Sequence, residues 1–327
     1  MKYFGEKMLW LIFIIILIIS LIAVIKSADI FVENLVEIGS FLGISEVILG
    51  VTAAAMGTSL PEFGSAMIAI LTGSPDVGVG CALGANIWNI GGILGISALV
   101  TGTITTRKAD IQRDGLMAFL TALILFIFLF IFGNINIFAG ILLILLYMAY
   151  LYHLINSQKK FKNESIIKSS AKNKNESVNF RKKVFLVILS IICLGIGCRI
   201  LVYTTVELSI LFSIPEIFAG ILLAFGTTAP EFFTVMTSAR RGLSSLAVGT
   251  VLGSNIFNIM IGLGVPALLV TIPVEKITIF YDAPALLIIT LTLLLLLRRK
   301  YKISKMESLV LVLFYVIYII LRIFWPF

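Results

Sequence analysis

The sequence predicts an all-α integral membrane protein with ten transmembrane helices, arranged as two inverted five-helix repeats. Composition gives the first reason: 60% of the 327 residues are apolar and 13% are charged, whereas a soluble domain has about 25% charged residues. The apolar residues also fall in blocks close to the length of about 20 residues that a membrane-spanning helix needs. Finally, a motif from the first half of the chain recurs in the second half.

The ten apolar blocks follow one another along the chain as the expected spans. Their bounds are 8–38, 45–71, 76–100, 114–132, 135–156, 184–211, 215–239, 244–271, 277–297 and 306–325. In the first block, Asp29, Glu33 and Glu37 recur every four residues on one helical face, so the end of this helix is expected to emerge into water. Lysines before the apolar run resemble a signal peptide, but the length of the run favours an uncleaved helix.

Lysine and arginine are concentrated in alternate loops. Nineteen of the 25 basic residues lie in the loops after the third, fifth, seventh and ninth spans. Because cytoplasmic loops carry the excess of basic residues, these loops are predicted to be cytoplasmic and both termini extracellular. The formal charge of +8 is thereby explained by the cytoplasmic loops of a cell membrane protein and does not indicate nucleic-acid binding.

A polar stretch rich in Lys, Asn and Ser divides the chain. Residues 158–183 are predicted to form a flexible cytoplasmic linker between a first five-helix repeat, 1–157, and a second, 184–327. Because five is odd, the second repeat enters the membrane from the opposite side.

The two halves carry matching motifs, predicted over 50–95 and 219–264. Residues 57–95 align without gaps to 226–264, with 17 identities in 39 positions. The shared residues include Gly, Pro, Glu and Asn at fixed spacing, which apolar composition alone does not explain. Inverted repeats with a binding site near the midplane are typical of secondary transporters.

Glu62 and Glu231 lie well inside the second and seventh spans at matching positions. A carboxylate at membrane depth costs at least a few kcal/mol unless it is protonated, paired or bound to a cation. No lysine or arginine occurs in residues 27–106 or 200–239, so neither motif contains a salt-bridge partner, although Arg199 remains an alternative. The pair therefore predicts a cation site.

The neighbours of these glutamates are oxygen donors. Pro61 and Pro230 lack an N–H, which frees carbonyl oxygens one turn earlier. Hydroxyl and amide oxygens come from Thr58, Ser59, Thr227, Thr228, Asn89 and Asn258. Such ligands favour Na⁺, Ca²⁺ or Mg²⁺ over zinc or copper. Two carboxylates match the charge of one Ca²⁺ or of two monovalent ions.

Two further acids match between the halves. Asp114 and Asp282 stand at the starts of the fourth and ninth spans, and a carboxylate at a helix N-terminus is a sufficient interpretation of both. Trp88 and Phe257, which precede Asn89 and Asn258, are expected to be packing residues.

The segments Gly57-Thr58-Ser59-Leu60-Pro61-Glu62 and Gly226-Thr227-Thr228-Ala229-Pro230-Glu231 resemble the alpha repeats of prokaryotic sodium/calcium exchangers, within the calcium/cation antiporter superfamily. So do the two later segments that end at Asn89 and Asn258. The resemblance implies Na⁺/Ca²⁺ exchange by alternating access, with ions held between spans 2, 3, 7 and 8. It further implies that spans 1 and 6 slide across this core.

The resemblance also implies roles for individual residues. Glu62 and Glu231 would be the shared carboxylates, with Asn89 and Asn258 in the middle of the site. Backbone carbonyls would come from Thr58, Thr227, Ala55 and Ala224, and hydroxyls from Ser59, Thr228 and Ser254. Transported Ca²⁺ and Na⁺ would be the ligands within the lipid bilayer, with no cofactor and no obligatory protein partner.

Two departures leave the coupling ion open. Ala85 stands where relatives often have Ser, and Asn258 stands where several have Asp. H⁺/Ca²⁺ antiport, exchange of another divalent cation such as Mg²⁺, and a cation channel are therefore retained as alternatives. An intramembrane enzyme is excluded, because the spans contain no nucleophile–base pair, catalytic Asp pair or HExxH motif.

Overall fold

The computed structural model describes residues 2–42, 57–165 and 180–324 and is built almost entirely of helices. Eight of the described helical runs are long and apolar enough to cross a membrane. They are Trp10–Gly39, Pro75–Thr101, Lys108–Phe132, Ile137–Ser157, Phe180–Phe212, Ser244–Leu269, Thr278–Lys300 and Lys305–Phe324. A ninth span is the pair α10 (Glu216–Thr227) and α11 (Ala229–Arg240), which is bent by 45° at its break.

Nine of the ten expected spans therefore have counterparts in the described chain. The remaining one, 45–71, is described only in its second part, where α3 spans Leu60–Leu71; residues 45–56 lie outside the described residues. The expectation of an all-helical membrane protein is confirmed.

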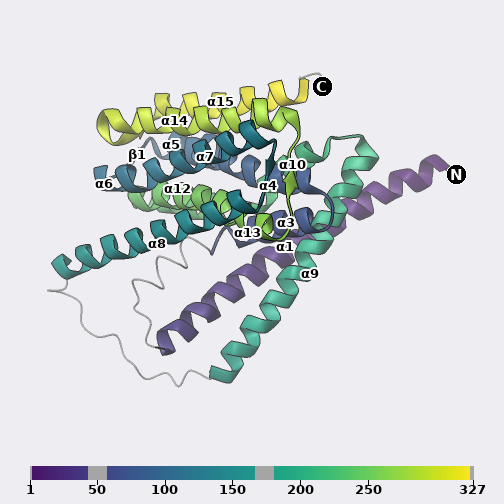
Figure 1. Cartoon of the computed structure of the whole chain (residues 1–327), viewed down its shortest axis with the longest axis horizontal. Coiled ribbons are helices and arrows are strands. Elements are labelled where there is room, and N and C mark those ends of the chain that lie inside the picture. Colours follow the sequence, from purple (N-terminus) through teal and green to yellow (C-terminus); the bar gives the residue numbers. More distant parts are fainter. Residues whose placement is uncertain (1, 43–56, 166–179, 325–327) are drawn as a thin grey trace.

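Helices α1 (Lys2–Phe41) and α9 (Phe180–Phe212) run side by side as one long pair, set obliquely to the other helices (Figure 1). The pair is antiparallel: Lys183 Nζ, at the start of α9, lies 2.7 Å from Glu37 Oε2, near the end of α1. A Cβ on Gly197 would lie 2.8 Å from Val24 Cγ2, so a larger residue there would require a shift where the two helices touch. With 40 residues, α1 is about 60 Å long at 1.5 Å per residue.

The remaining helices stack beside this pair (Figure 1). In the first half they are α4 (Pro75–Trp88), the π-helical η1 (Asn89–Leu94), α5 (Gly95–Thr101), α6 (Lys108–Asp110), the π-helical η2 (Ile111–Gly115), α7 (Leu116–Phe132) and α8 (Ile137–Ser165). In the second half they are α12 (Ser244–Met260), α13 (Gly264–Leu269), the π-helical η3 (Thr278–Asp282), α14 (Ala283–Lys300) and α15 (Lys305–Phe324). Their outer faces expose large apolar side chains, as lipid contact requires.

Helices occupy both ends of the stretch predicted to be a linker. Helix α8 continues to Ser165 and α9 begins at Phe180, so residues 158–165 and 180–183 are helical. The division of the chain into two domains at 157 and 184 stays a prediction.

Two short antiparallel ribbons join the halves. Strand β1 (Thr103–Thr105) pairs with β4 (Lys302–Ser304), and β2 (Asn134–Ile135) pairs with β3 (Ile272–Pro273). The register places Ile104 opposite Ile303 in one ribbon and Ile272 opposite Ile135 in the other. Ile104 and Ile272 are 168 positions apart in the sequence, and so are Ile135 and Ile303. The ribbons are thus two copies of one arrangement, as an inverted repeat requires.

The two halves interlock where α4 crosses α10. A Cβ on Gly80 of α4 would lie 2.3 Å from the Ile217 carbonyl oxygen, and a Cβ on Gly220 of α10 would lie 2.3 Å from that of Val77. Any side chain at either position would push the backbones apart. Glycine therefore brings these helices into backbone contact, next to the glutamate motifs.

Candidate functional site

Glu62 and Glu231 occupy equivalent places in the two halves. Each lies in the first turn of a helix, α3 or α11, directly after a proline at the second helical position. Proline suits this position because its missing N–H has no helical partner there and its φ is already helical. Each glutamate is 1% exposed. The positive end of the helix dipole favours a carboxylate at this position.

The site contains an unusual density of buried oxygen atoms without hydrogen-bond partners in the described structure. Seven such atoms come from six of the predicted site residues. They are Thr58 Oγ1, Glu62 Oε1 and Oε2, Asn89 Oδ1, Glu231 Oε2, Ser254 Oγ and Asn258 Oδ1. Burying a polar atom without a partner is costly, and nearly all buried polar groups in folded proteins have one. These oxygens are chemically suited to a hard cation.

A reciprocal network of four asparagines fixes two of these oxygens. Asn86 Nδ2 donates to the Asn255 carbonyl oxygen at 2.9 Å, and Asn255 Nδ2 donates to the Asn86 carbonyl oxygen at 3.0 Å. Asn89 Nδ2 donates to Asn255 Oδ1 at 3.0 Å, and Asn258 Nδ2 donates to Asn86 Oδ1 at 3.1 Å. With their N–H groups engaged, Asn89 and Asn258 are left with free side-chain oxygens.

Asn86 and Asn255 were not among the predicted site residues. Both belong to the repeated segments and lie three residues before Asn89 and Asn258. That spacing, present twice, was the available signal, because residues three apart share one helical face.

The hydroxyl groups of the predicted site residues differ in the atoms to which they donate: one contacts a carboxylate and others contact a backbone carbonyl. Ser59 Oγ donates to Glu231 Oε1 at 3.0 Å, which links the first half to the carboxylate of the second. Thr228 Oγ1 instead donates to the Ala224 carbonyl oxygen at 2.8 Å, and Thr227 Oγ1 lies 3.2 Å from the same atom. The Ala224 carbonyl, a predicted ligand, thus accepts hydrogen bonds from its own helix. Ala55 lies outside the described residues.

Within the described chain, the two carboxylates are not compensated by lysine or arginine. Among the described residues, no lysine or arginine forms an ion pair with Glu62 or Glu231. The two side chains are near enough to interact electrostatically. The site is therefore a concentration of negative charge and neutral oxygen dipoles within the helix bundle.

The equivalent positions 85 and 254 differ between the two halves. Ser254 has a buried hydroxyl, whereas Ala85 is buried in an apolar cluster with Cys81, Leu223 and Ala224. The first half thus has no side-chain oxygen at this position.

Trp88 and Phe257 pack as the sequence predicted. Trp88 contacts Phe225 and Tyr315, with ring centroids 4.6 and 4.8 Å away. Phe257 contacts Tyr147 and Phe63 at 5.9 and 6.2 Å. These rings fix the helices from which Asn89 and Asn258 project.

Known proteins are similar to this chain in sequence and in fold. The Methanosarcina acetivorans sodium/calcium exchanger MaX1 is 30% identical over 340 residues, covering 94% of this chain and 97% of that protein. The Escherichia coli inner membrane protein YrbG is 30% identical over 288 residues, covering 87% and 88%. The sodium-calcium exchanger NCX_Mj, in crystals soaked with 100 mM Na⁺ and 10 mM Sr²⁺, matches with a TM-score of 0.62 and 27% identity, over 95% of this chain and 98% of that one.

The Sodium/calcium exchanger protein family matches residues 12–156 and 182–324, one segment in each half. The two segments cover most of the chain. This multi-pass membrane protein therefore belongs to the sodium/calcium exchanger family, whose members are cation antiporters and not enzymes.

Proposed function

We propose that this protein exchanges Na⁺ for Ca²⁺ by alternating access, and that Glu62 and Glu231 hold the ions between α3, α4, α11 and α12. One observation carries the proposal: seven buried oxygen atoms, three on the Glu62 and Glu231 carboxylates and four on neighbouring side chains, lack partners within the described structure.

The oxygen set suits Ca²⁺ in number and charge. Ca²⁺ takes about 6–8 oxygen ligands and accepts carboxylate, amide, hydroxyl and carbonyl oxygens alike. Glu62 and Glu231 supply two negative charges, and Thr58, Asn89, Ser254 and Asn258 supply neutral oxygens. Ser59 holds one oxygen of Glu231, which leaves the other for the ion.

Exchange follows from this charge balance. Two carboxylates are neutralised by one Ca²⁺ or by Na⁺ ions, and the repulsion between cations keeps both sets from occupying the site together. Each ion must leave before its competitor binds. A change of access between the two occupancies then moves the ions in opposite directions. The inverted halves provide two related conformations for that change.

The names of two relatives support Na⁺ and Ca²⁺ as the exchanged ions. MaX1 is a sodium/calcium exchanger, and NCX_Mj is a sodium-calcium exchanger whose crystals were soaked with Na⁺ and Sr²⁺. Strontium is a divalent cation that prefers oxygen ligands, as Ca²⁺ does. The proposal transfers this ion pair to the site described above.

The test is ⁴⁵Ca²⁺ uptake into proteoliposomes that contain the purified protein. Vesicles are loaded with Na⁺ and diluted into Na⁺-free buffer, and a parallel set carries an outward H⁺ gradient without Na⁺. We expect uptake driven by the Na⁺ gradient alone. Uptake driven only by H⁺ would assign proton coupling in place of Na⁺, and no uptake under either gradient would contradict Ca²⁺ as the substrate.

A further inference from the structure

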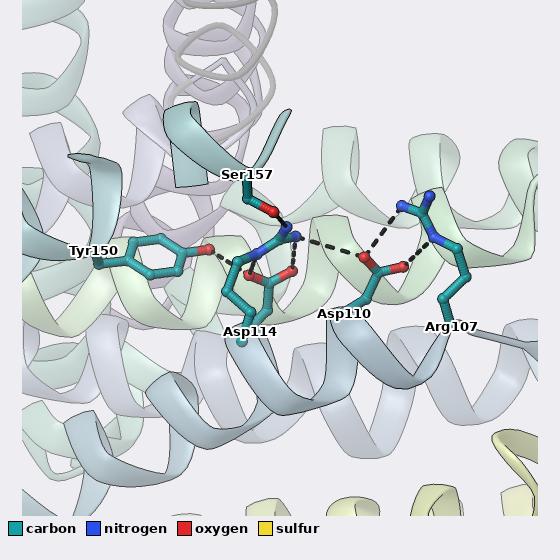
Figure 2. Close-up of polar contacts among 6 residues, drawn as sticks. Arg107, Asp110, Asp114, Tyr150 and Ser157 are labelled. Carbon is teal, nitrogen blue, oxygen red and sulfur yellow. Dashed lines mark hydrogen bonds and ion pairs between the residues drawn. The ribbon is translucent and has the colours of Figure 1, made fainter. Parts of the chain in front are cut away.

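A buried carboxylate lies outside the ion site in the first half of the chain (Figure 2). The Asp114 carboxylate, in η2, accepts from Arg113 Nε at 2.6 Å and from Tyr150 OH at 3.0 Å. Arg113 also donates a hydrogen bond to Ser157 Oγ at 3.3 Å. Next to this group, Arg107 forms an ion pair with Asp110. Figure 2 shows Tyr150 pointing at Asp114 from α8. The carboxylate thus ties the start of α7 to the middle of α8.

The second half contains an equivalent group. Tyr318 OH, in α15, donates to Asp282 Oδ1 in η3 at 2.8 Å, and Arg322 Nε lies 3.2 Å from the same oxygen. Asp282 and Tyr318 are each 168 positions after Asp114 and Tyr150. The interpretation of both aspartates as ordinary helix N-terminal carboxylates is therefore incomplete, because each holds a tyrosine from the next long helix.

The arginines are not equivalent. Arg113 precedes its aspartate in the sequence, whereas Arg322 comes from α15, and position 154, its counterpart in the first half, is a leucine. Arg322 and Asp282 have side chains that are both 1% exposed. The Asp–Tyr bond has been kept in both halves while the charge partner differs. This points to the tyrosine bond itself as the shared feature.

An aromatic chain leads from each Asp–Tyr pair to the ion site. One turn before Tyr150, Tyr147 contacts both Tyr150 and Phe257, at 6.4 and 5.9 Å between ring centroids. In the other half, Tyr315 contacts Tyr318 at 6.3 Å and Trp88 at 4.8 Å.

Each chain ends on the ring that directly precedes a site asparagine. Phe257 precedes Asn258, and Trp88 precedes Asn89. Phe257 also contacts Phe63, which follows Glu62. Movement of α8 or α15 would therefore displace the rings against which the ion ligands are set.

We propose that the Asp114–Tyr150 and Asp282–Tyr318 bonds are positioning elements, which set the placement of Asn258 and Asn89 through the aromatic chains and thereby tune cation affinity. The inference rests on the proposed function, because it takes these asparagines as ion ligands. A hydrogen bond to an ionised group is stronger than one between neutral groups, and both bonds here are buried. Each phenol is thus held firmly enough to fix the turn that bears Tyr147 or Tyr315.

Tyr150→Phe and Tyr318→Phe test the proposal, because each removes one hydroxyl and keeps the ring. Tyr152→Phe is the matched control: it lies on the same helix as Tyr150, and Tyr152 is 72% exposed. Two quantities are measured for every variant in purified protein: the Ca²⁺ concentration that half-saturates ⁴⁵Ca²⁺ uptake, and the rise in melting temperature caused by added Ca²⁺.

We expect Tyr150→Phe and Tyr318→Phe to raise the half-saturating Ca²⁺ concentration by about threefold to thirtyfold, the range over which packed networks couple to a distant site. The melting curve should need correspondingly more Ca²⁺ to shift, and Tyr152→Phe should match the wild type. A lower melting temperature with an unchanged Ca²⁺ requirement would show a purely structural role and overturn the proposal. Measurements on the wild-type protein distinguish failure of this inference from failure of the proposed function. If the wild type neither transports Ca²⁺ nor is stabilised by it, the proposed function is wrong and this inference loses its basis.

Discussion

At the scale of single residues, the central feature is a buried pair of acids, Glu62 and Glu231, without a basic partner in the described part of the chain. The surrounding neutral oxygens cannot neutralise Glu62 and Glu231, so in the proposed function a bound cation would do so. The pair therefore favours binding at the expense of the stability of the ion-free protein, because uncompensated buried charge is costly.

The first prediction concerns Glu62→Gln and Glu231→Gln. Each should lower Ca²⁺ transport by about two orders of magnitude or more, since ligand charge governs Ca²⁺ affinity over that scale. Neither should unfold the protein, because a neutral amide replaces an unpaired charge. The measurement is ⁴⁵Ca²⁺ uptake together with melting curves with and without Ca²⁺. Glu33→Gln, at an exposed position of α1, serves as the control; wild-type transport by either site variant would contradict the proposed site.

The second prediction concerns the asparagine network. Asn86→Ala and Asn255→Ala each remove the acceptor of a neighbouring amide, which leaves a buried N–H without a partner at a cost of about 1–3 kcal/mol. Asn258 or Asn89 then loses its anchor, so both stability and Ca²⁺ affinity should fall. Because the bonds are reciprocal, the two variants should behave alike in melting and uptake measurements. An effect confined to one of them would show that the network is not symmetric.

At the scale of helices, backbone contact between α4 and α10 positions the two glutamate motifs. The third prediction is that Gly80→Ala destabilises the protein by about 1–3 kcal/mol, the usual cost of overpacking, because the new Cβ meets the Ile217 carbonyl oxygen. The melting temperature in detergent measures the effect. Gly195→Ala in α9 is the control, since apart from the backbone of its own helix turn no described atom lies within 4 Å of its Cβ position. Equal melting temperatures for both variants would contradict the contact.

The sequence predicted the positions of the helices but not the π-helical segments within them. The apolar blocks and the repeated motifs were sufficient for nine spans and for the glutamate pair. The π-helical segments η1, η2 and η3 were not predicted, because a shift from i→i+4 to i→i+5 bonding leaves no mark in hydrophobic periodicity. Arg322 was equally hidden, since it lies 40 positions from Asp282 and has no counterpart in the other half.

At the scale of the whole molecule, the two β-ribbons relate the halves by inversion. Thr103, the first residue of β1, and Thr271, directly before β3, are equivalent positions, and both are exposed. If basic loops are cytoplasmic, the ribbon beside Arg107 and Lys302 faces the cytoplasm and the other faces outward.

The fourth prediction tests this orientation. In a background without native cysteines, Thr271→Cys should react with a membrane-impermeant thiol reagent added to intact cells. Thr103→Cys should react only after the membrane is permeabilised. The reverse pattern would invert the predicted topology, and labelling of both positions in intact cells would contradict the placement of the ribbons on opposite sides.

The bonds that build the proposed ion site cross from one half of the chain to the other. Ser59 holds Glu231, and Asn86 and Asn255 exchange hydrogen bonds between α4 and α12. A polypeptide with only one repeat would thus contain half a site. For a one-repeat ancestor to have transported ions, it must have inserted into the membrane in both orientations and paired with an upside-down copy of itself. Fusion of two such genes would have fixed one orientation for each copy, and would then have allowed Ala85 and Ser254 to diverge.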